Sequence, residues 1–415
     1  MSKIIVKHSP PLSGTVSCSG SKNAALPILA STILTQGKSI LENIPDLSDT
    51  AHMLSILSGL GAVCSREQKR VSIDFTHCRD FCAPYEHVSK FRGSFLLAAP
   101  LLARMGKARI SMPGGCPIGN RPIDLHLKGF VALGAEAENG HGFVDLRAKK
   151  LRGAKIYLDF PSVGATENLI MAAVLAEGET IIENAAAEPE VCDLADFLNK
   201  QGAYITGAGS DTITILGVES LTPTSYKIIS DRIEAGTIMS AFAITGGRGT
   251  IENVNPMHLK PVTAKLTEMG VIVNEHETSV DVDASGKLLC ANIKTLPFPG
   301  FPTDMQAQFS ALMCKAQGTG IIVETVFENR FLHIGELNRM GANIRIDGRS
   351  SVIEGPQHLS GAKVSAFDLR GGASLVLAGL CASGETEIIG TEHIRRGYED
   401  LSGKLSSLGA DIFLD

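Results

Sequence analysis

The chain repeats itself six times, and this repetition limits the possible folds more than any other feature of the sequence. Six short segments resemble one another: "SGLGAVC", "VALGAEA", "NKQGAYI", "TEMGVIV", "NRMGANI" and "SSLGADI". Their glycines, Gly61, Gly134, Gly202, Gly270, Gly341 and Gly409, are separated by 73, 68, 68, 71 and 68 residues. A fixed period indicates that one structural unit is built several times over. We therefore expect six related units of roughly 70 residues each.

Each copy predicts the same order of helices and strands. An apolar run typical of a helix, such as "NLIMAAVLA", precedes a β-branched strand such as "ETIIEN". A second helix follows with its apolar residues on one face, as at Leu401, Leu405 and Leu408. We expect the repeat glycine to end this helix in the left-handed conformation and to lead into the next strand. Because helices and strands alternate throughout, the sequence predicts an α/β protein.

Length and charge narrow the class of protein further. A chain of 415 residues favours two or three domains. Its net charge of −6 gives no basic stripe, so we expect neither nucleic acid nor an anionic membrane as a partner. No apolar run has transmembrane length and the N-terminus does not resemble a secretory signal, so we expect a cytoplasmic protein. Nothing indicates an obligatory protein partner.

The cysteines indicate reduced thiols rather than a disulfide framework. There are nine of them, without a close CxxC pair. Cys78 and Cys82 lie near His77, but a zinc ion needs a further ligand at a recognisable spacing, which the sequence does not offer. We therefore expect no metal site there and treat these cysteines as packing residues.

Polar residues gather where the copies pass from a strand into their first helix. They are Lys22, Asn23, Ser162, Asp231, Asp304, Asp368 and Arg370. Backbone N–H groups and the helix dipole favour anions at such positions, so the junctions are expected to face one anion-binding cleft. The alternative is that the Ser and Asp residues are only N-caps. Lys22 and Arg370 favour the cleft, because a cation at the positive end of a helix is unfavourable unless an anion compensates for it.

A longer loop distinguishes the second copy. "MPGGCPIGNRPID" replaces the shorter "NIPDLSD" of the first copy and carries Cys116 among glycines and prolines. Loops that lengthen at one place in a repeat array are often functional. With Arg121 nearby and Lys22 expected close, the thiol is expected to have a lowered pKa and to act as an acid or a nucleophile. A passively exposed cysteine is the alternative.

Seven ordered stretches resemble the UDP-N-acetylglucosamine 1-carboxyvinyltransferase family of enolpyruvyl transferases. They are "SGSKNAALPIL" (19–29), "PGGCPIGNRPIDLHLKGF" (113–130), "PSVGATENL" (161–169), "FPTDMQAQF" (301–309), "ETVFENRF" (324–331), "DLRGGASLVLAGL" (368–380) and "HIRRGYED" (393–400). The resemblance implies a two-domain inside-out α/β barrel of six βαβαββ-type repeats, three in each domain. It implies a first lobe of 22–229, with the cysteine loop at 112–122, and a second lobe of 1–21 plus 230–415.

The resemblance also implies a reaction. The family transfers the enolpyruvyl group of phosphoenolpyruvate to the 3′-hydroxyl of UDP-N-acetylglucosamine and releases phosphate, which is the first committed step of bacterial peptidoglycan synthesis. Addition gives a tetrahedral ketal, and elimination of phosphate completes the transfer. Such chemistry needs an acid, a base and several cations, and no metal or organic cofactor is expected.

Catalytic roles follow from the same resemblance. Cys116 is expected to protonate the methylene carbon and to form a covalent adduct, and Asp304 to act as the base that faces the sugar hydroxyl. Lys22, Arg121 and Arg396 are expected to hold phosphate and carboxylate, with Arg92 and Arg370 nearby. Bidentate arginines suit both anions.

The remaining substrate contacts are implied in the same way. Asn23 is expected to bind the intermediate and Arg330 to orient the closed lobe. Residues 121–125 (Arg121, Pro122, Ile123, Asp124 and Leu125) are expected to line a uracil pocket; Ser162, Val163 and Gly164 to bind the diphosphate; and Asp304 and Val326 to meet the amino sugar. This chain departs from some family members at Phe160, where they carry lysine. For His126 a structural hydrogen bond is expected rather than catalysis.

Three alternatives stay open. The shikimate-pathway transferase has the same fold and donor, but it lacks the "PGGC" loop. A non-catalytic sugar-nucleotide sensor would not need Lys22, Cys116, Asp304, Arg370 and Arg396 together. Sixfold repetition alone also suggests a ring-like clamp, against which the acidic charge and the uneven loops argue.

Overall fold

The computed structural model describes residues 3–83, 92–112, 123–140 and 142–415. The described residues fall into two compact units: unit 1 consists of residues 3–19 and 230–415, and unit 2 lies within residues 20–229. The chain passes between the units at the peptide bonds 19–20 and 229–230. The first crossing lies two residues before the one expected from the sequence, and the expected lobe limits stay a prediction.

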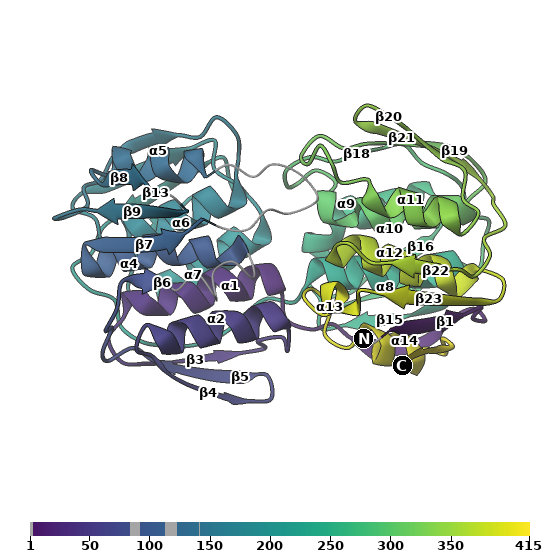
Figure 1. The fold of residues 1–415 in the computed structure, drawn as a ribbon, viewed down its shortest axis with the longest axis horizontal. Coiled ribbons are helices and arrows are strands. Elements are labelled where there is room, and N and C mark those ends of the chain that lie inside the picture. Colours follow the sequence, from purple (N-terminus) through teal and green to yellow (C-terminus); the bar gives the residue numbers. More distant parts are fainter. Residues whose placement is uncertain (1–2, 84–91, 113–122, 141) are drawn as a thin grey trace. The chain divides into compact units, whose positions relative to one another are not determined.

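Unit 2 contains three copies of the repeat (Figure 1). The first consists of α1 (Lys22–Ser31), η1 (Thr32–Leu34), β3 (Lys38–Glu42), α2 (Ser48–Gly59), β4 (Val63–Glu67) and β5 (Arg70–Asp74). The second consists of β6 (Cys82–Ala83), η2 (Arg92–Leu97), α4 (Ala98–Met105), β7 (Lys107–Ser111), α5 (Asp124–Ala132), β8 (Glu136–Asn139) and β9 (Phe143–Arg147). The third consists of β10 (Lys155–Tyr157), α6 (Val163–Ala173), β11 (Glu179–Glu183), α7 (Pro189–Lys200), β12 (Tyr204–Thr206) and β13 (Thr212–Leu216), after which β14 (Ser225–Lys227) ends the unit.

Unit 1 contains the other three copies. Before the first crossing the chain forms β1 (Ile4–Lys7) and β2 (Ser13–Ser17). After the return come α8 (Arg232–Thr245), β15 (Arg248–Glu252), α9 (Pro256–Glu268), β16 (Ile272–Glu275), β17 (Ser279–Asp283), β18 (Ile293–Lys294), η3 (Thr303–Met305), α10 (Gln306–Lys315), β19 (Gly318–Val323), α11 (Leu332–Arg339), β20 (Ile344–Asp347) and β21 (Ser350–Gly355). The last copy holds β22 (Lys363–Ser365), α12 (Leu369–Cys381), β23 (Glu385–Ile389), α13 (Thr391–Ile394), α14 (Leu401–Ser407) and β24 (Ile412–Leu414).

The sheets confirm the predicted βαβαββ repeat. In the described ranges the strands form six four-stranded sheets: β14-β3-β5-β4, β6-β7-β9-β8 and β10-β11-β13-β12 in unit 2, and β2-β15-β17-β16, β18-β19-β21-β20 and β22-β23-β1-β24 in unit 1. In each sheet the first pair is parallel and the other two pairs are antiparallel, as for β10 with β11 and β11 with β13. Three sheets take one strand from elsewhere in the chain, namely β14, β2 and β1.

The six repeat glycines confirm the predicted helix ends. In the first five copies the glycine follows the second helix, and in the sixth copy it follows α14. The φ angles of the six glycines lie between 90° and 111°. Residues with a Cβ rarely adopt these angles, whereas glycine does so at little cost. The chain can therefore turn out of each helix at the glycine, and only one or two residues separate the glycine from the next strand.

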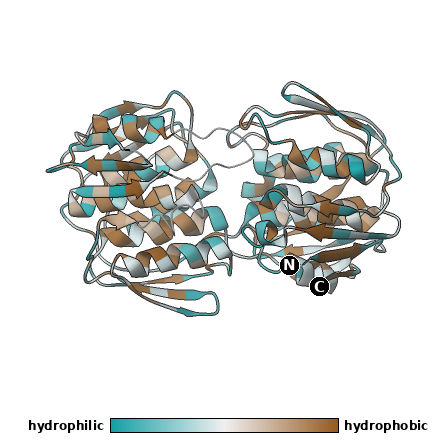
Figure 2. Cartoon of the chain, in the orientation of Figure 1, coloured by the Kyte–Doolittle hydropathy of each residue, from teal (hydrophilic) through white to brown (hydrophobic). Residues whose placement is uncertain are grey.

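Helices occupy the interior of each unit and sheets lie outside them, which confirms the inside-out arrangement. In unit 1, α8, α10 and α12 pack on one another, and α8 is buried continuously from Ile233 to Ile244. The strands bury alternate residues, as in the pattern of β11, so only one face of each sheet meets the helices. Figure 2 shows apolar residues along these enclosed helices. None of the helices in the described ranges has both the length and the apolar character needed to cross a bilayer.

Candidate active site

Three equivalent helix starts in unit 1 carry the predicted aspartates. Asp231 caps α8, with Oδ1 accepting from the N–H groups of Ile233 (2.8 Å) and Glu234 (3.0 Å). Asp368 caps α12 and accepts from the N–H groups of Arg370 and Gly371. These two residues are therefore N-caps, the alternative that the sequence left open. Asp304 lies in η3 and is different, because its carboxylate faces two arginines.

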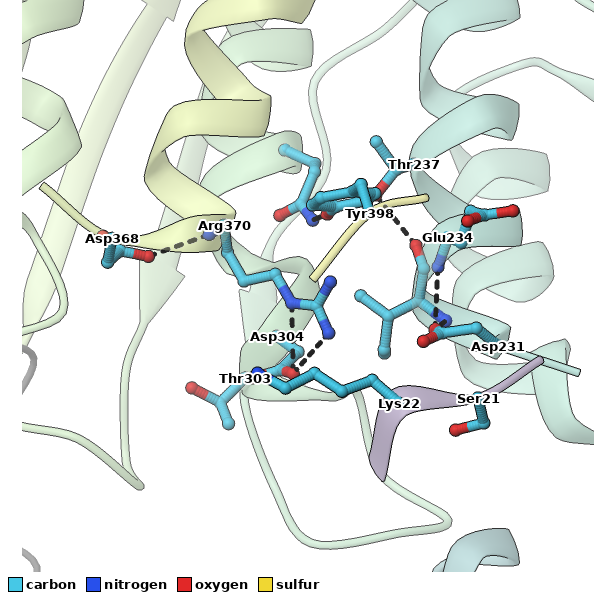
Figure 3. Close-up of polar contacts among 12 residues, drawn as sticks. Ser21, Lys22, Asp231, Glu234, Thr237, Thr303, Asp304, Asp368, Arg370 and Tyr398 are labelled. Atoms are coloured by element: carbon cyan, nitrogen blue, oxygen red, sulfur yellow. Dashed lines mark hydrogen bonds and ion pairs between the residues drawn. The ribbon is translucent and has the colours of Figure 1, made fainter. Parts of the chain in front are cut away.

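The Asp304 carboxylate is held between Arg330 and Arg370. Arg370 donates to Oδ2 from Nε (3.2 Å) and Nη2 (3.0 Å) (Figure 3). Arg330 Nη2 lies 2.8 Å from Oδ1. Burial alone would raise the pKa of Asp304, but the two guanidinium groups outweigh it and hold the pKa well below its usual range. Asp304 is therefore ionised, in the proton-accepting form.

Arg370 is fixed from a second side by an aromatic residue. Its guanidinium lies 5.1 Å from the centroid of the Tyr398 ring, and the Arg370 side chain is only 1% exposed. The Tyr398 hydroxyl lies 3.0 Å from both Thr237 Oγ1 and Gln308 Nε2. Burial would lower the pKa of Arg370, but Tyr398, Asp304 and Asp231 raise it, so the group stays charged. Tyr398 and Gln308 were not predicted as site residues, although both lie in the stretches of sequence that carried the resemblance.

Lys22 in unit 2 is paired with a carboxylate that sequence reasoning missed. It begins α1 after the N-cap Ser21, and its Nζ lies 2.7 Å from Asp49 Oδ2 of α2. The two side chains are 8% and 3% exposed. Chain carboxylates therefore compensate both Lys22 and Arg370, and neither cation requires a bound anion on electrostatic grounds alone. Asn23 follows Lys22 in the first turn of the same helix.

The predicted diphosphate residues lie at the start of α6. Ser162 is its N-cap and accepts a hydrogen bond from Ala165 N (3.4 Å), and Val163 and Gly164 form the first turn. A Cβ on Gly164 would lie 3.4 Å from the ring of His126, so α5 passes close by. The His126 ring is 2.8 Å from Asn168 Nδ2, which is the structural hydrogen bond expected for it.

The other predicted positions are less informative. Ile123 is buried before α5, and Asp124 and Leu125 begin that helix. Phe160 is 43% exposed and brings no charge to the start of α6. Val326 follows β19 in unit 1, and Arg396, which is partly exposed, follows α13.

Four predicted residues fall wholly or partly outside the described structure. Cys116, Arg121 and Pro122 lie outside the described residues, and so does the side chain of Arg92. The structure thus brings together Asp304, Arg330 and Arg370 in unit 1, while the roles of these four stay a prediction. Across the described ranges, no three His, Cys, Asp or Glu side chains are arranged to hold a metal ion.

Comparison with known proteins identifies the class. The family model described as EPSP synthase (3-phosphoshikimate 1-carboxyvinyltransferase) matches residues 6–405, and the chain belongs to this family. Within it, the chain is 56% identical over 411 residues to UDP-N-acetylglucosamine 1-carboxyvinyltransferase 1 of Caldanaerobacter subterraneus subsp. tengcongensis, covering 99% of both chains. It is 55% identical over 414 residues to UDP-N-acetylglucosamine 1-carboxyvinyltransferase 2 of Carboxydothermus hydrogenoformans, again covering 99% of both. The resemblance seen in the sequence is thereby confirmed.

Solved structures agree on the fold. The enolpyruvyl transferase NikO from Streptomyces tendae matches with a TM-score of 0.90 at 27% identity, covering 100% of this chain and 98% of that one. EPSP synthase from Acinetobacter baumannii matches with a TM-score of 0.78 at 19% identity and covers 100% of both chains. The second likeness concerns the fold alone.

Proposed function

We propose that the chain transfers the enolpyruvyl group of phosphoenolpyruvate to the 3′-hydroxyl of UDP-N-acetylglucosamine and releases phosphate, in the first committed step of bacterial peptidoglycan synthesis. The observation that carries this proposal is the identity of 52–56% over at least 99% of the chain to relatives that bear the name of this activity. We also propose that the reaction takes place in the cytoplasm, where phosphoenolpyruvate and nucleotide sugars are made.

Asp304 is the base in this proposal. As the sugar oxygen attacks the enol carbon, its proton becomes acidic and passes to an Asp304 carboxylate oxygen. Arg330 and Arg370 keep this carboxylate ionised and fix both of its oxygens, so the base is positioned before substrate binds.

Cys116 supplies the matching proton to the methylene carbon, and the sulfur can add to the enolpyruvyl carbon as a covalent adduct. The donor's phosphate and carboxylate are held by Lys22, Arg121 and Arg396, with Arg92 and Arg370. Asn23 binds the intermediate, and Arg330 orients the closed lobe. Two segments meet the nucleotide: Arg121, Pro122, Ile123, Asp124 and Leu125 on the uracil, and Ser162, Val163 and Gly164, at the start of α6, on the diphosphate. Val326 meets the amino sugar. Asp368 contributes by fixing the first turn of α12.

A variant of Asp304 tests the assignment of the base. Asp304→Asn removes the proton acceptor, so kcat is expected to fall by about 10² to 10⁴ while UDP-N-acetylglucosamine still binds. The substitution also weakens the hold on two buried arginines, so stability falls too. The measurement is the mass of the enolpyruvyl product together with calorimetric binding of the nucleotide sugar.

Asp145→Asn is the matched control. Asp145 also accepts two hydrogen bonds from an arginine, Arg109, at 2.6 and 2.7 Å, but it lies on β9 away from the helix starts. We expect it to lose stability and to keep turnover. Equal turnover of the Asp304 variant and the wild type would refute the role of Asp304.

A further inference from the structure

Glu324 is a buried carboxylate with no assigned role, and one hydroxyl links it to Arg330, which binds Asp304. Glu324 directly follows β19 and is fully buried. Its Oε1 accepts from Thr295 Oγ1 (2.8 Å), Val326 N (2.8 Å) and Phe327 N (3.1 Å). Three donors on one oxygen offset the cost of burying the charge and fix the carboxylate in one orientation.

The second oxygen of Glu324 reaches Arg330 through one hydroxyl. Thr303 Oγ1 donates to Glu324 Oε2 (2.8 Å) and accepts from Arg330 Nη1 (2.9 Å). A hydroxyl has a single proton, and an ionised carboxylate can only accept, so the proton must point to Glu324. The lone pairs of Thr303 are thereby turned towards Arg330. The direction of every bond from Glu324 to Asp304 is fixed.

Arg330 has few other contacts that could orient it. Its side chain is 4% exposed, and in the described part of the chain its Nε has no hydrogen-bond partner. One terminal nitrogen rests on Thr303 and the other on Asp304. The guanidinium also lies 5.5 Å from the ring centroid of Phe327, whose N–H is bound by Glu324. The two contacts that orient Arg330 apart from Asp304, the Thr303 hydroxyl and the Phe327 ring, thus both belong to residues bound by Glu324.

We propose that Glu324 and Thr303 are positioning residues that fix Arg330, and through it Asp304, for enolpyruvyl transfer, an inference that rests on the proposed function. Glu324 directs the Thr303 hydroxyl, Thr303 holds one end of the guanidinium, and the other end holds the base. Without the Thr303 hydroxyl the guanidinium loses one of its two hydrogen-bond partners, and the carboxylate of Asp304 can turn away from the reacting hydroxyl.

Three substitutions separate positioning from general stability. Thr303→Val keeps the shape of the side chain and removes the hydroxyl, whereas Thr303→Ser keeps the hydroxyl. Thr295→Val is the matched control, since Thr295 donates to the other oxygen of the same carboxylate and makes no hydrogen bond with Arg330 among the described residues. We expect Thr303→Val to lower kcat by at least about 10-fold with little change in KM for UDP-N-acetylglucosamine. Thr303→Ser and Thr295→Val are expected to stay within about 3-fold of wild-type kcat.

Two results would overturn the proposal. One is a loss of kcat that is proportional to the loss of thermal stability in both Thr303→Val and Thr295→Val. The other is an unchanged kcat in Thr303→Val. A crystal structure of Thr303→Val gives a readout that does not depend on activity: the Arg330 guanidinium is expected to leave its place beside Asp304 Oδ1. An unmoved Arg330 would refute the positioning whatever acceptor the enzyme uses. A wild type without turnover would refute the proposed function and leave this structural comparison valid.

Discussion

At the scale of single residues, buried carboxylates hold the backbone on both sides where the chain passes between the units. In unit 1, Glu234 accepts from Ser19 N (2.9 Å) and is paired with Lys404. In unit 2, Asp193 accepts from Ile229 N (3.1 Å) and from the Tyr226 hydroxyl (2.7 Å). Each segment is thus fixed within its own unit up to the residue at which it leaves.

Asp193 makes the stability of unit 2 depend on pH. Burial raises its pKa to about 6, because the opposing hydrogen bonds from Tyr226 and Ile229 are weaker and Asp196 and Glu190 add repulsion. A carboxyl group whose pKa is higher in the folded state stabilises the fold at pH values below its pKa in the unfolded state, which is about 4. This stabilisation is lost as the pH rises through the folded-state pKa of about 6. Ionised Asp193 therefore destabilises the folded state at neutral pH.

Asp193→Asn tests this effect, since an amide can accept from Ile229 N and donate to the Tyr226 oxygen without carrying charge. Between pH 4 and pH 7 the free energy of unfolding of the wild type is expected to fall relative to the variant by on the order of 2 kcal/mol. The measurement is urea unfolding of both proteins across this range. Parallel pH curves would show that Asp193 has an ordinary pKa.

The sequence predicted the location of the site residues better than their partners. Comparing the copies located Asp231, Asp304 and Asp368 at equivalent helix starts, which the structure bears out. Asp49 and Glu324 could not be found in this way. They lie elsewhere in their copies, and only tertiary packing brings them to Lys22 and Thr303.

At the scale of elements, an asparagine joins two strands in the same way in three copies. Asn43, Asn184 and Asn253 follow the second strand of their sheets with φ of 63°, 55° and 56°. Their Nδ2 atoms donate to Ile228 O (3.2 Å), Leu158 O (2.7 Å) and Cys18 O (2.8 Å), next to the first strand of each sheet. Asparagine suits the site because it tolerates the left-handed region and carries a donor.

Substitutions at Asn184 separate these two properties. Asn184→Gly keeps the favourable backbone and loses the hydrogen bond, so a loss of about 1 kcal/mol in unfolding free energy is expected. Asn184→Ala loses the hydrogen bond and adds left-handed strain, for a total of about 2–3 kcal/mol. Denaturant unfolding provides the comparison. An alanine variant as stable as the glycine variant would show that the backbone angle costs nothing.

The long elements were predictable and the short ones were not. An apolar run identified α6 and a β-branched run identified β11, because hydrophobic period and length both carry the signal. The strands β6 and β18 have two residues each, too few for any periodic pattern. These two strands form by parallel pairing with the edges of β7 and β19, respectively.

At the scale of the whole molecule, the two ends of the chain complete the sixth repeat. β1 pairs antiparallel with β24, and Lys3 and Asp415 exchange two backbone hydrogen bonds of 2.9 and 2.8 Å. In the other five sheets the equivalent two strands follow each other directly, as β4 and β5 do. The sequence showed the six copies, and the family resemblance assigned the first residues to the second lobe. Neither the repeats nor the resemblance showed that β1 takes the place in its sheet that β5 takes in the first copy. That place depends on strand pairing between the two ends of the chain.

A circular permutant tests this interpretation of the ends. Joining them by a short glycine-containing linker and opening the chain between Glu277 and Thr278, in the exposed turn after β16, is expected to leave the fold and the thermal stability nearly unchanged. Opening it inside the buried helix α8, between Ile238 and Met239, is expected to prevent folding. Circular dichroism and calorimetry distinguish the two. Loss of folding in the first permutant would contradict the interpretation.

The most direct test of the central claim, enolpyruvyl transfer to a nucleotide sugar, is the release of phosphate from phosphoenolpyruvate with each candidate acceptor in turn. Continuous release is expected with UDP-N-acetylglucosamine, and no release above background is expected with 3-phosphoshikimate, the acceptor in the name of the family model. Release that depends on 3-phosphoshikimate, or that needs neither acceptor, would contradict this claim.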